Sequence, residues 1–281
     1  TLAAELPSDY MFTIAKGDST LSSDKERSAT ATVMISAKQA SNFGSIGVIP
    51  NTALSLFAFH DSNLDGQWQE GEPPFSGARL QVLRDGKPAV EAATDGEGIA
   101  LIPLLRAGDL QLRLELPDGQ IFSVPGGEQG NLFSSATAES SLMVDFSLQP
   151  GTTGKALAGI TLPAAISGQL FDDLNTNGAW EEGESMLPGF TVQAINQEGV
   201  SVAETVTDEE GSYHLSPLVP GSYQVRFLLQ TPYIFSEPPE HGAQVVNKVT
   251  HQTAEYGQTE PISLRAGETV EGIDGAIFRS A

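Results

Sequence analysis

The stretch Asp61-Ser-Asn-Leu-Asp-Gly-Gln-Trp-Gln-Glu-Gly-Glu72 recurs further along the chain as Asp173-Leu-Asn-Thr-Asn-Gly-Ala-Trp-Glu-Glu-Gly-Glu184, 112 residues later. Downstream of each copy the landmarks keep the same order, since Ile121-Phe122-Ser123 is matched by Ile234-Phe235-Ser236, 113 residues later. Landmarks in the same order and at nearly the same spacing do not arise by chance. The chain therefore contains a tandem repeat of roughly 110 residues.

This repeat divides the 281-residue chain into three parts. Residues 1–51 match only the C-terminal part of a repeat, whereas residues 52–164 and residues 165–281 each form a complete one, called repeat 1 and repeat 2 from here on. Since the first part starts in the middle of a repeat, we expect its missing strands to lie upstream. The linkers, Pro50-Asn51 and Pro163-Ala164, are very short, which predicts a fairly stiff string of modules.

Inside each repeat, the segments alternate between apolar and polar residues. The apolar positions of two such segments are Leu110, Leu112, Leu114 and Leu116 in repeat 1, and Tyr223, Val225 and Phe227 in repeat 2. Alternation with a period of two, bounded by Gly, Pro and Asp, is typical of half-buried strands, and no segment shows a convincing helical period with caps. Several short strands in roughly 110 residues predict an all-β fold, with an antiparallel β-sandwich in each repeat.

Composition narrows the range of functions. Hydrophobic residues make up 40% of the chain, enough for packed cores. A formal net charge of −22 provides no basic surface for nucleic acid and disfavours anionic membranes, while bound cations would relieve the self-repulsion. The chain contains no cysteine, which excludes disulfides and thiolate metal sites. No apolar run approaches the ~20 residues that span a bilayer, and no signal peptide opens the sequence.

The two matching stretches, called loop 1 (residues 61–72) and loop 2 (residues 173–184), have the spacing of the 12-residue Ca²⁺ loop. That loop presents side-chain oxygens at positions 1, 3, 5, 9 and 12, a backbone carbonyl at position 7 and a glycine at position 6. The predicted ligands of loop 1 are Asp61, Asn63, Asp65, the carbonyl of Gln67, Gln69 and Glu72. Those of loop 2 are Asp173, Asn175, Asn177, the carbonyl of Ala179, Glu181 and Glu184.

Ca²⁺ suits these residues because it is a hard cation that binds oxygen ligands in a flexible geometry. Gly66 and Gly178 permit the sharp turn, and without an ion the carboxylates of loop 1 would crowd together. The alternative is an ordinary surface turn, since Asn, Asp and Gly favour turns anyway. Two copies at equivalent positions favour the calcium site. Mg²⁺ is a poorer candidate because it keeps its waters.

Other residues give weaker signals. Trp68 and Trp180 both stand at position 8 of a loop, which predicts an apolar anchor to the core; an exposed platform for a sugar is the alternative. His60 aligns with Asp172, so the repeats share no histidine at this position that could act in catalysis. The chain has no P-loop, serine nucleophile elbow or zinc-binding helix motif. We therefore expect no catalytic residues, no cofactor other than Ca²⁺ and no enzyme activity.

The motif series of repeat 2 resembles a known family. Its motifs are Gly168-Gln-Leu-Phe-Asp-Asp-Leu-Asn-Thr-Asn-Gly178, Thr207-Asp208, Gly211-Ser-Tyr213 and Leu218-Val-Pro-Gly-Ser-Tyr223. They are similar to the B repeats of staphylococcal Sdr adhesins, which are relatives of the collagen-adhesin B domain. The resemblance covers nearly all of repeat 2 and, more loosely, repeat 1. Repeat 1 departs from the motifs by apolar exchanges: Leu56, Ala100 and Leu110 replace Gly168, Tyr213 and Tyr223.

The resemblance implies a prealbumin-like (Cna-B-like) sandwich, Ca²⁺-dependent rigidity and a stalk on a bacterial surface. Related B domains in pilins carry a Lys–Asn isopeptide crosslink, but the first strands here have no Lys, so calcium would be the stiffening device. Three hypotheses follow: a calcium-stabilised spacer of an exported surface adhesin, an adhesive module that binds a host protein or glycan, and an accessory domain of a secreted enzyme. The spacer leads, and it implies an extracellular monomer in contact with calcium ions and neighbouring repeats.

Overall fold

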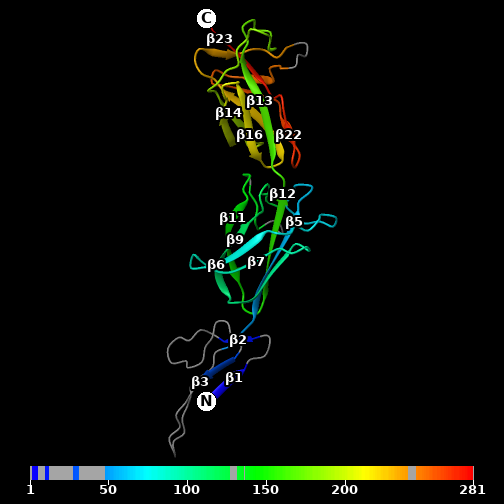
Figure 1. The fold of residues 1–281 in the computed structure, drawn as a ribbon, viewed down its shortest axis with the longest axis vertical. Coiled ribbons are helices and arrows are strands. Elements are labelled where there is room, and N and C mark those ends of the chain that lie inside the picture. Colours follow the sequence, from blue (N-terminus) through cyan, green and yellow to red (C-terminus); the bar gives the residue numbers. More distant parts are fainter. Residues whose placement is uncertain are drawn as a thin grey trace, which may run out of the picture.

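The computed structural model describes residues 2–5, 10–12, 28–31, 48–126, 132–135, 137–239 and 245–280. Within these ranges every regular element is a β-strand, which confirms the all-β prediction. Figure 1 shows two sandwiches that follow one another along the long axis of the molecule, with four short strands at the N-terminal end. None of the described residues forms a helix that could cross a membrane.

The short N-terminal strands are β1 (Leu2–Glu5), β2 (Tyr10–Phe12), β3 (Ser28–Ala31) and β4 (Val48–Pro50). They form two antiparallel pairs, β1 with β3 and β2 with β4. The prediction that residues 1–51 form the end of a repeat depends largely on segments outside the described residues, residues 32–36 among them. It therefore stays a prediction.

In the described part of the chain, repeat 1 consists of eight strands. They are β5 (Thr52–His60), β6 (Arg79–Arg84), β7 (Lys87–Ala93), β8 (Ile99–Leu105), β9 (Gly108–Glu115), β10 (Ile121–Phe122), β11 (Ser141–Leu148) and β12 (Thr153–Thr161). One sheet has the strand order β10-β12-β5-β8 and the other has the order β11-β9-β6-β7. Buried side chains from both sheets form one cluster, so the sheets are the two layers of a sandwich.

Repeat 2 follows the same plan, and its first strand begins at Ala164, one residue before the boundary taken from the sequence. Its strands are β13 (Ala164–Asp172), β14 (Thr191–Ile195), β15 (Ser201–Val206), β16 (Ser212–Leu218), β17 (Gly221–Leu228), β18 (Tyr233–Phe235), β19 (Val249–Gln252), β20 (Tyr256–Thr259), β21 (Ile262–Leu264), β22 (Thr269–Val270) and β23 (Gly275–Arg279). One sheet has the order β16-β13-β23-β18, with β22 also on β13. The other has the order β15-β14-β17-β20-β19, with β21 also on β17. The strands at the end of repeat 2 are thus shorter and more numerous than those at the end of repeat 1.

Pairing between the strands of each sandwich is antiparallel except where the first strand meets the last. In repeat 1, β12 pairs with β5 in parallel, from Thr153 beside Ala53 to Ile160 beside His60. In repeat 2, β22 and β23 pair with β13 in the same sense. Each first strand is therefore held between the last strand and an antiparallel neighbour, which fixes the position of the loop that follows it. Each sandwich is therefore antiparallel, as predicted, except for the pairing of its first strand with its last.

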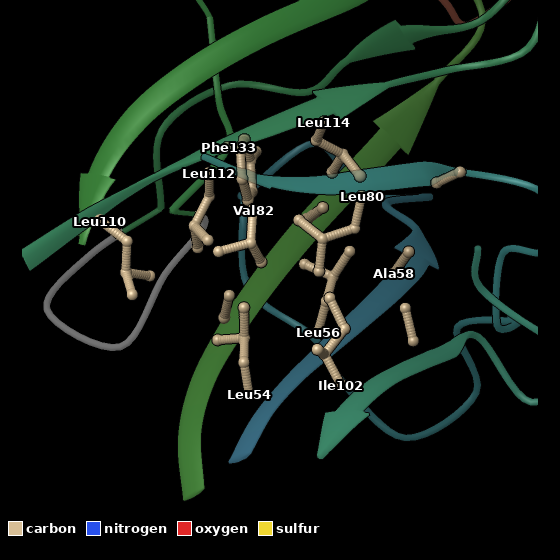
Figure 2. Packing of buried hydrophobic residues seen from close by; sticks show 14 of the residues in the cluster. Leu54, Leu56, Ala58, Leu80, Val82, Ile102, Leu110, Leu112, Leu114 and Phe133 are labelled. Carbon is tan, nitrogen blue, oxygen red and sulfur yellow. The ribbon is translucent and has the colours of Figure 1, made fainter. Parts of the chain in front are cut away.

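The core of repeat 1 lies between its two sheets. Figure 2 shows side chains that fill this space: Leu54, Leu56, Ala58, Leu80, Val82, Ile102, Leu110, Leu112, Leu114 and Phe133. The alternation predicted for β9 and β17 is confirmed, since both strands point their apolar side chains into the cores; only Leu116, the last of its series, is half-buried. Each fully buried Leu or Phe contributes about 1.5–3 kcal/mol relative to exposure.

Candidate metal centre

Loop 1 follows β5 and loop 2 follows β13, so each begins at the end of the first strand of its repeat. Each loop is preceded by a strand, which separates it from an EF-hand loop with its flanking helices. Because β12 runs parallel to β5 and ends beside it, loop 1 lies at the end of repeat 1 that leads into repeat 2. Loop 2 lies at the end of repeat 2 that is farther from repeat 1 (Figure 1).

Position 1 of both loops is a buried carboxylate. Asp61 is 2% exposed and Asp173 is 0% exposed. Asp61 Oδ1 accepts the N–H of Asp65 at 3.2 Å, and Oδ2 accepts that of Gly66 at 2.8 Å. Asp173 accepts the equivalent two bonds in loop 2 at 3.1 and 2.7 Å. A buried negative charge needs such donors, and a cation beside it would compensate the charge further.

Positions 3, 5 and 9 of loop 1 bring their side chains together. Asn63 Nδ2 donates to Asp65 Oδ2 and to Gln69 Oε1, each at 3.0 Å. Gln69 Nε2 also donates to Asp65. Three of the side chains that the spacing predicts to share one ion therefore lie within hydrogen-bond distance of one another.

The same three positions meet in loop 2, around a different carboxylate. Asn175 Nδ2 donates to Glu181 Oε2 at 2.7 Å, and Asn177 Nδ2 donates to Glu181 Oε1 at 2.9 Å. The acidic residue stands at position 9 in loop 2 and at position 5 in loop 1. Each loop thus has three carboxylates among its predicted ligands, at partly different positions.

Position 12 closes both loops through hydrogen bonds. Glu72 accepts the N–H of Ser62 at 3.0 Å on one oxygen and that of Gln69 at 2.9 Å on the other. Glu184 accepts the equivalent N–H groups of Leu174 and Glu181, both at 3.0 Å. The glutamate therefore connects the start of the loop with its second half, whether or not it binds an ion.

The glycine at position 6 lets each loop pack closely against a neighbouring segment. Gly66 has φ +71° and Gly178 has φ +73°, a conformation that other residues rarely adopt. A Cβ added at Gly66 would lie 2.3 Å from the nitrogen of Gly126, and one at Gly178 would lie 2.2 Å from the oxygen of Glu237. Sequence reasoning missed these supporting segments. The signal was there, because the matched Phe-Ser landmarks stand just before them in the chain.

The predicted ligands of both loops are oxygen donors, the type of ligand that Ca²⁺ prefers. Across the residues that the structure describes, no three His, Asp or Glu side chains are grouped so that they could hold a metal ion. A cation in either loop would therefore depend on amide and carbonyl oxygens as well, as in known Ca²⁺ loops. Gln67 and Ala179 donate their N–H to the position-5 side chains at 2.8 Å; the predicted role of their carbonyls stays a prediction.

The tryptophan at position 8 does not enter the core. Trp68 is 50% exposed and Trp180 is 37% exposed, so the prediction of a core anchor is wrong. Trp68 instead meets Phe57 on the outer face of β5, edge to face at 5.6 Å between ring centroids. Trp180 Nε1 donates to the carbonyl of Glu184 at 3.1 Å. Both indoles thus lie on the outside of their sandwiches, Trp68 against the outer face of β5 and Trp180 against the backbone of its own loop.

The two repeats are thus β-sandwiches of one plan, each with an oxygen-rich loop after its first strand. The family described as SdrD B-like domain matches residues 164–277. Repeat 2 therefore belongs to that family, and the resemblance to Sdr B repeats is confirmed.

Relatives of the chain extend across both repeats. Serine-aspartate repeat-containing protein D of Staphylococcus aureus is 25% identical over 225 residues, 79% of this chain and 17% of that protein. Colossin-A of Dictyostelium discoideum is 30% identical over 234 residues, 83% of this chain and 2% of that protein. The chain thus spans a small part of the length of these relatives, and the similarity is not confined to bacterial proteins.

Among solved structures, the minor pilin GBS52 of Streptococcus agalactiae aligns with 82% of this chain and 98% of its own, at 14% identity and a TM-score of 0.34.

Proposed function

We propose that repeats 1 and 2 are calcium-stabilised spacer modules of an exported surface adhesin-like protein. The observation that carries the proposal is one oxygen-rich donor set assembled at the same place in two sandwiches. A chance surface turn explains one such loop, but two loops with the same hydrogen-bond pattern favour a shared purpose. Membership of repeat 2 in the SdrD B-like family supports a role in a repeat-containing adhesin.

Calcium would act on the first strand and the loop that follows it. The side chains at positions 1, 3, 5, 9 and 12 would hold the ion, which supplies positive charge to carboxylates that otherwise repel one another. Extracellular calcium modules have Kd of about 10⁻⁴–10⁻³ M, so millimolar calcium would stabilise each repeat by about 0.4–1.4 kcal/mol. This gain matters for a spacer because it holds the end of each sandwich in one shape.

The same proposal places the chain outside the cell, where millimolar calcium is available, with neighbouring repeats as its partners and no catalytic role. The net charge of −22 agrees with this setting, since it disfavours self-association and rewards bound cations.

The test is tryptophan fluorescence and melting temperature, in EDTA and then with titrated Ca²⁺. Each loop contains one of the two Trp residues, so each reports its own site. We expect a saturable emission change and a higher melting temperature, with one site lost in Asp61→Ala and the other in Asp173→Ala. Asp118→Ala, which removes an exposed charge outside the loops, is the matched control. No response at millimolar Ca²⁺ would reduce the loops to ordinary turns.

The half-exposed indoles favour a second candidate function, an adhesive module that binds a glycan. Indole faces at the surface stack on sugars and are common in binding sites. This candidate predicts that Trp68→Ala and Trp180→Ala abolish binding to a glycan array while calcium still raises the melting temperature. If the chain binds no glycan on the array, the spacer remains as the single candidate function.

A further inference from the structure

The two loops differ in their surroundings although their internal hydrogen bonds match. In loop 1, Leu64 and Asp65 are half-buried, whereas the equivalent Thr176 and Asn177 of loop 2 are exposed. Asp and Asn have nearly the same size, so the difference comes from what lies next to the loop. Loop 1 faces repeat 2, while no strand of the described chain follows repeat 2 beyond loop 2 (Figure 1).

A hollow of about 750 Å³ lies between the two repeats. Repeat 1 contributes Leu64 of loop 1 and Val124 and Pro125, which follow β10. Repeat 2 contributes the turn between β14 and β15 and the turn between β16 and β17. The hollow thus has one wall from each repeat.

Both walls of this hollow carry apolar side chains. Val200 on the repeat 2 side is 55% exposed, and Val202 beside it is half-buried. Val219 and Tyr223 lie behind them and are buried. Apolar side chains on the two walls of one hollow favour contact with one another, because contact would remove them from water.

The connection between the repeats is very short. Only Leu162 and Pro163 separate β12 from β13, and Pro163 has a fixed φ. Leu162 lies close to Gly267 of repeat 2, where an added Cβ would come within 3.3 Å of Leu162 Cδ1. A connection of two residues therefore keeps the two walls of the hollow near each other.

We infer that loop 1, together with Val124 and Pro125, is the surface on which repeat 2 rests, and that Leu64 is its central apolar contact. The partner of this surface is the next repeat of the same chain, through Val200 and Val202. Leu64 stands between two predicted cation ligands, Asn63 and Asp65. Under the proposed function, an ion in loop 1 therefore fixes the angle between the repeats, whereas an ion in loop 2 does not.

The test measures the distribution of distances between spin labels in the full chain. Because the chain contains no cysteine, Met143→Cys on β11 and Val206→Cys on β15 create the only two labelling sites. Both side chains are exposed, 46% and 54%, and neither lines the hollow. The labelled chain should give one narrow distribution in calcium.

Leu64→Asn should broaden this distribution, since it removes the apolar contact. Asn suits the left-handed backbone of Leu64, φ 61°, so the loop itself should stay intact. Val200→Ser should broaden it too, and the double variant should be no broader than either single one. Thr176→Asn, at the same position and φ 60° in loop 2, is the matched control and should change nothing. An unchanged width for Leu64→Asn, with both repeats folded by tryptophan emission, would overturn the inference.

Measurements with and without calcium distinguish a failure of this inference from a failure of the proposed function. EDTA and Asp61→Asn should broaden the distribution, while Asp173→Asn should not. If calcium changes neither the width nor the Trp emission while Leu64→Asn broadens the distribution, the calcium role fails and the junction surface stands. If calcium binds and Leu64→Asn has no effect, the junction surface fails alone.

Discussion

Repeats 1 and 2 fill the same place in their cores with opposite distributions of bulk. In repeat 1, Leu56 on β5 lies beside Ala100 on β8, and both are buried. In repeat 2, Gly168 on β13 lies beside Tyr213 on β16. The large side chain has moved from the first strand to its neighbour, and the small one has moved the other way. The two repeats therefore conserve the volume between two strands rather than the residue at either position.

The exchange of bulk goes together with a change in the last strand. In repeat 1, β12 pairs with β5 without a break. In repeat 2, Ile166 pairs with Val270 but Leu170 pairs with Gly275, so the last strand has one residue more across this interval. The extra residue is a bulge, and the carbonyl of Ile273 in it accepts the Tyr213 hydroxyl at 2.5 Å. A buried phenol needs an acceptor, and the bulge supplies one.

The largest effect that tests this comparison is a cavity in repeat 1. Leu56→Ala removes a side chain that is 0% exposed and lies between Ala100 and Ala156 on the two neighbouring strands, so no large residue beside it in the sheet can fill the space. We expect repeat 1 to lose about 2–5 kcal/mol. The measurement is urea unfolding followed by Trp68 in a Trp180→Phe background, which reports repeat 1 alone. Leu101→Ala, at a 57% exposed neighbour, should cost under about 0.5 kcal/mol.

The opposite change in repeat 2 should be the next largest. A Cβ at Gly168 would lie 2.2 Å from the oxygen of Ile273, and backbone on both sides must shift to admit it. We expect Gly168→Ala to destabilise repeat 2 by about 1–3 kcal/mol. The measurement is urea unfolding monitored by Trp180 emission in a Trp68→Phe background. Gly221→Ala is the control, since its nearest contact would be 3.8 Å away. Equal costs for both variants would mean that the close approach of β13 to the bulge is unimportant.

Much of the fold could be predicted from the sequence because it follows local patterns. The period-two alternation of β9 and β17 identified the strands and their inward faces, and burial confirms both. The parallel pairing of first and last strand could not be predicted this way, since it joins segments about a hundred residues apart. The exchange between Leu56 and Gly168 was visible only as an apolar departure from a motif. Its meaning depends on which residues face each other across strands.

The candidate loops show the same limit at smaller scale. Spacing predicted oxygen donors at positions 1, 3, 5, 9 and 12, and the structure joins several of these side chains by hydrogen bonds; their role as ligands stays a prediction. The spacing could not predict where the Trp68 side chain lies, because position 8 looks identical in sequence whether the indole points inward or outward. Nor could the spacing show that Leu64 of loop 1 shares a hollow with residues of repeat 2, since that depends on how the two sandwiches are placed.

Alkaline pH should separate the repeats by a smaller amount. Burial raises the pKa of Tyr213 well above its usual value near 10, and the Asp274 carboxylate raises it further. Burial also raises the pKa of Tyr223, with a smaller contribution from Glu198. When the chain unfolds, both phenols ionise near pH 10, whereas in the fold they keep their protons. Their contribution to stability is therefore complete below pH 10 and is lost as the pH rises through the raised values.

Each of these tyrosines should destabilise repeat 2 by up to about 1.4 kcal/mol per pH unit above 10. Repeat 1 contains no tyrosine and is the internal control, followed by Trp68 in the same chain. Urea midpoints for the two repeats at pH 9, 10 and 11 measure the difference. If both midpoints fall together, or if the double variant Tyr213→Phe/Tyr223→Phe keeps the effect, another group is responsible.

The smallest expected effect isolates the hydroxyl from the bulk of the ring. Tyr213→Phe keeps the ring, which meets Phe227 edge to face at 5.5 Å, but leaves the Ile273 carbonyl without this donor. We expect a loss of about 1 kcal/mol at pH 7 in the Trp180 unfolding curve. Tyr213→Leu should cost more, because it removes ring volume. In repeat 1 the equivalent volume comes from Leu56 on the first strand, whereas the first strand of repeat 2 has only Gly168 at this place. If Leu at this position proved as stable as Phe, volume across the strand pair would not be what the two repeats conserve.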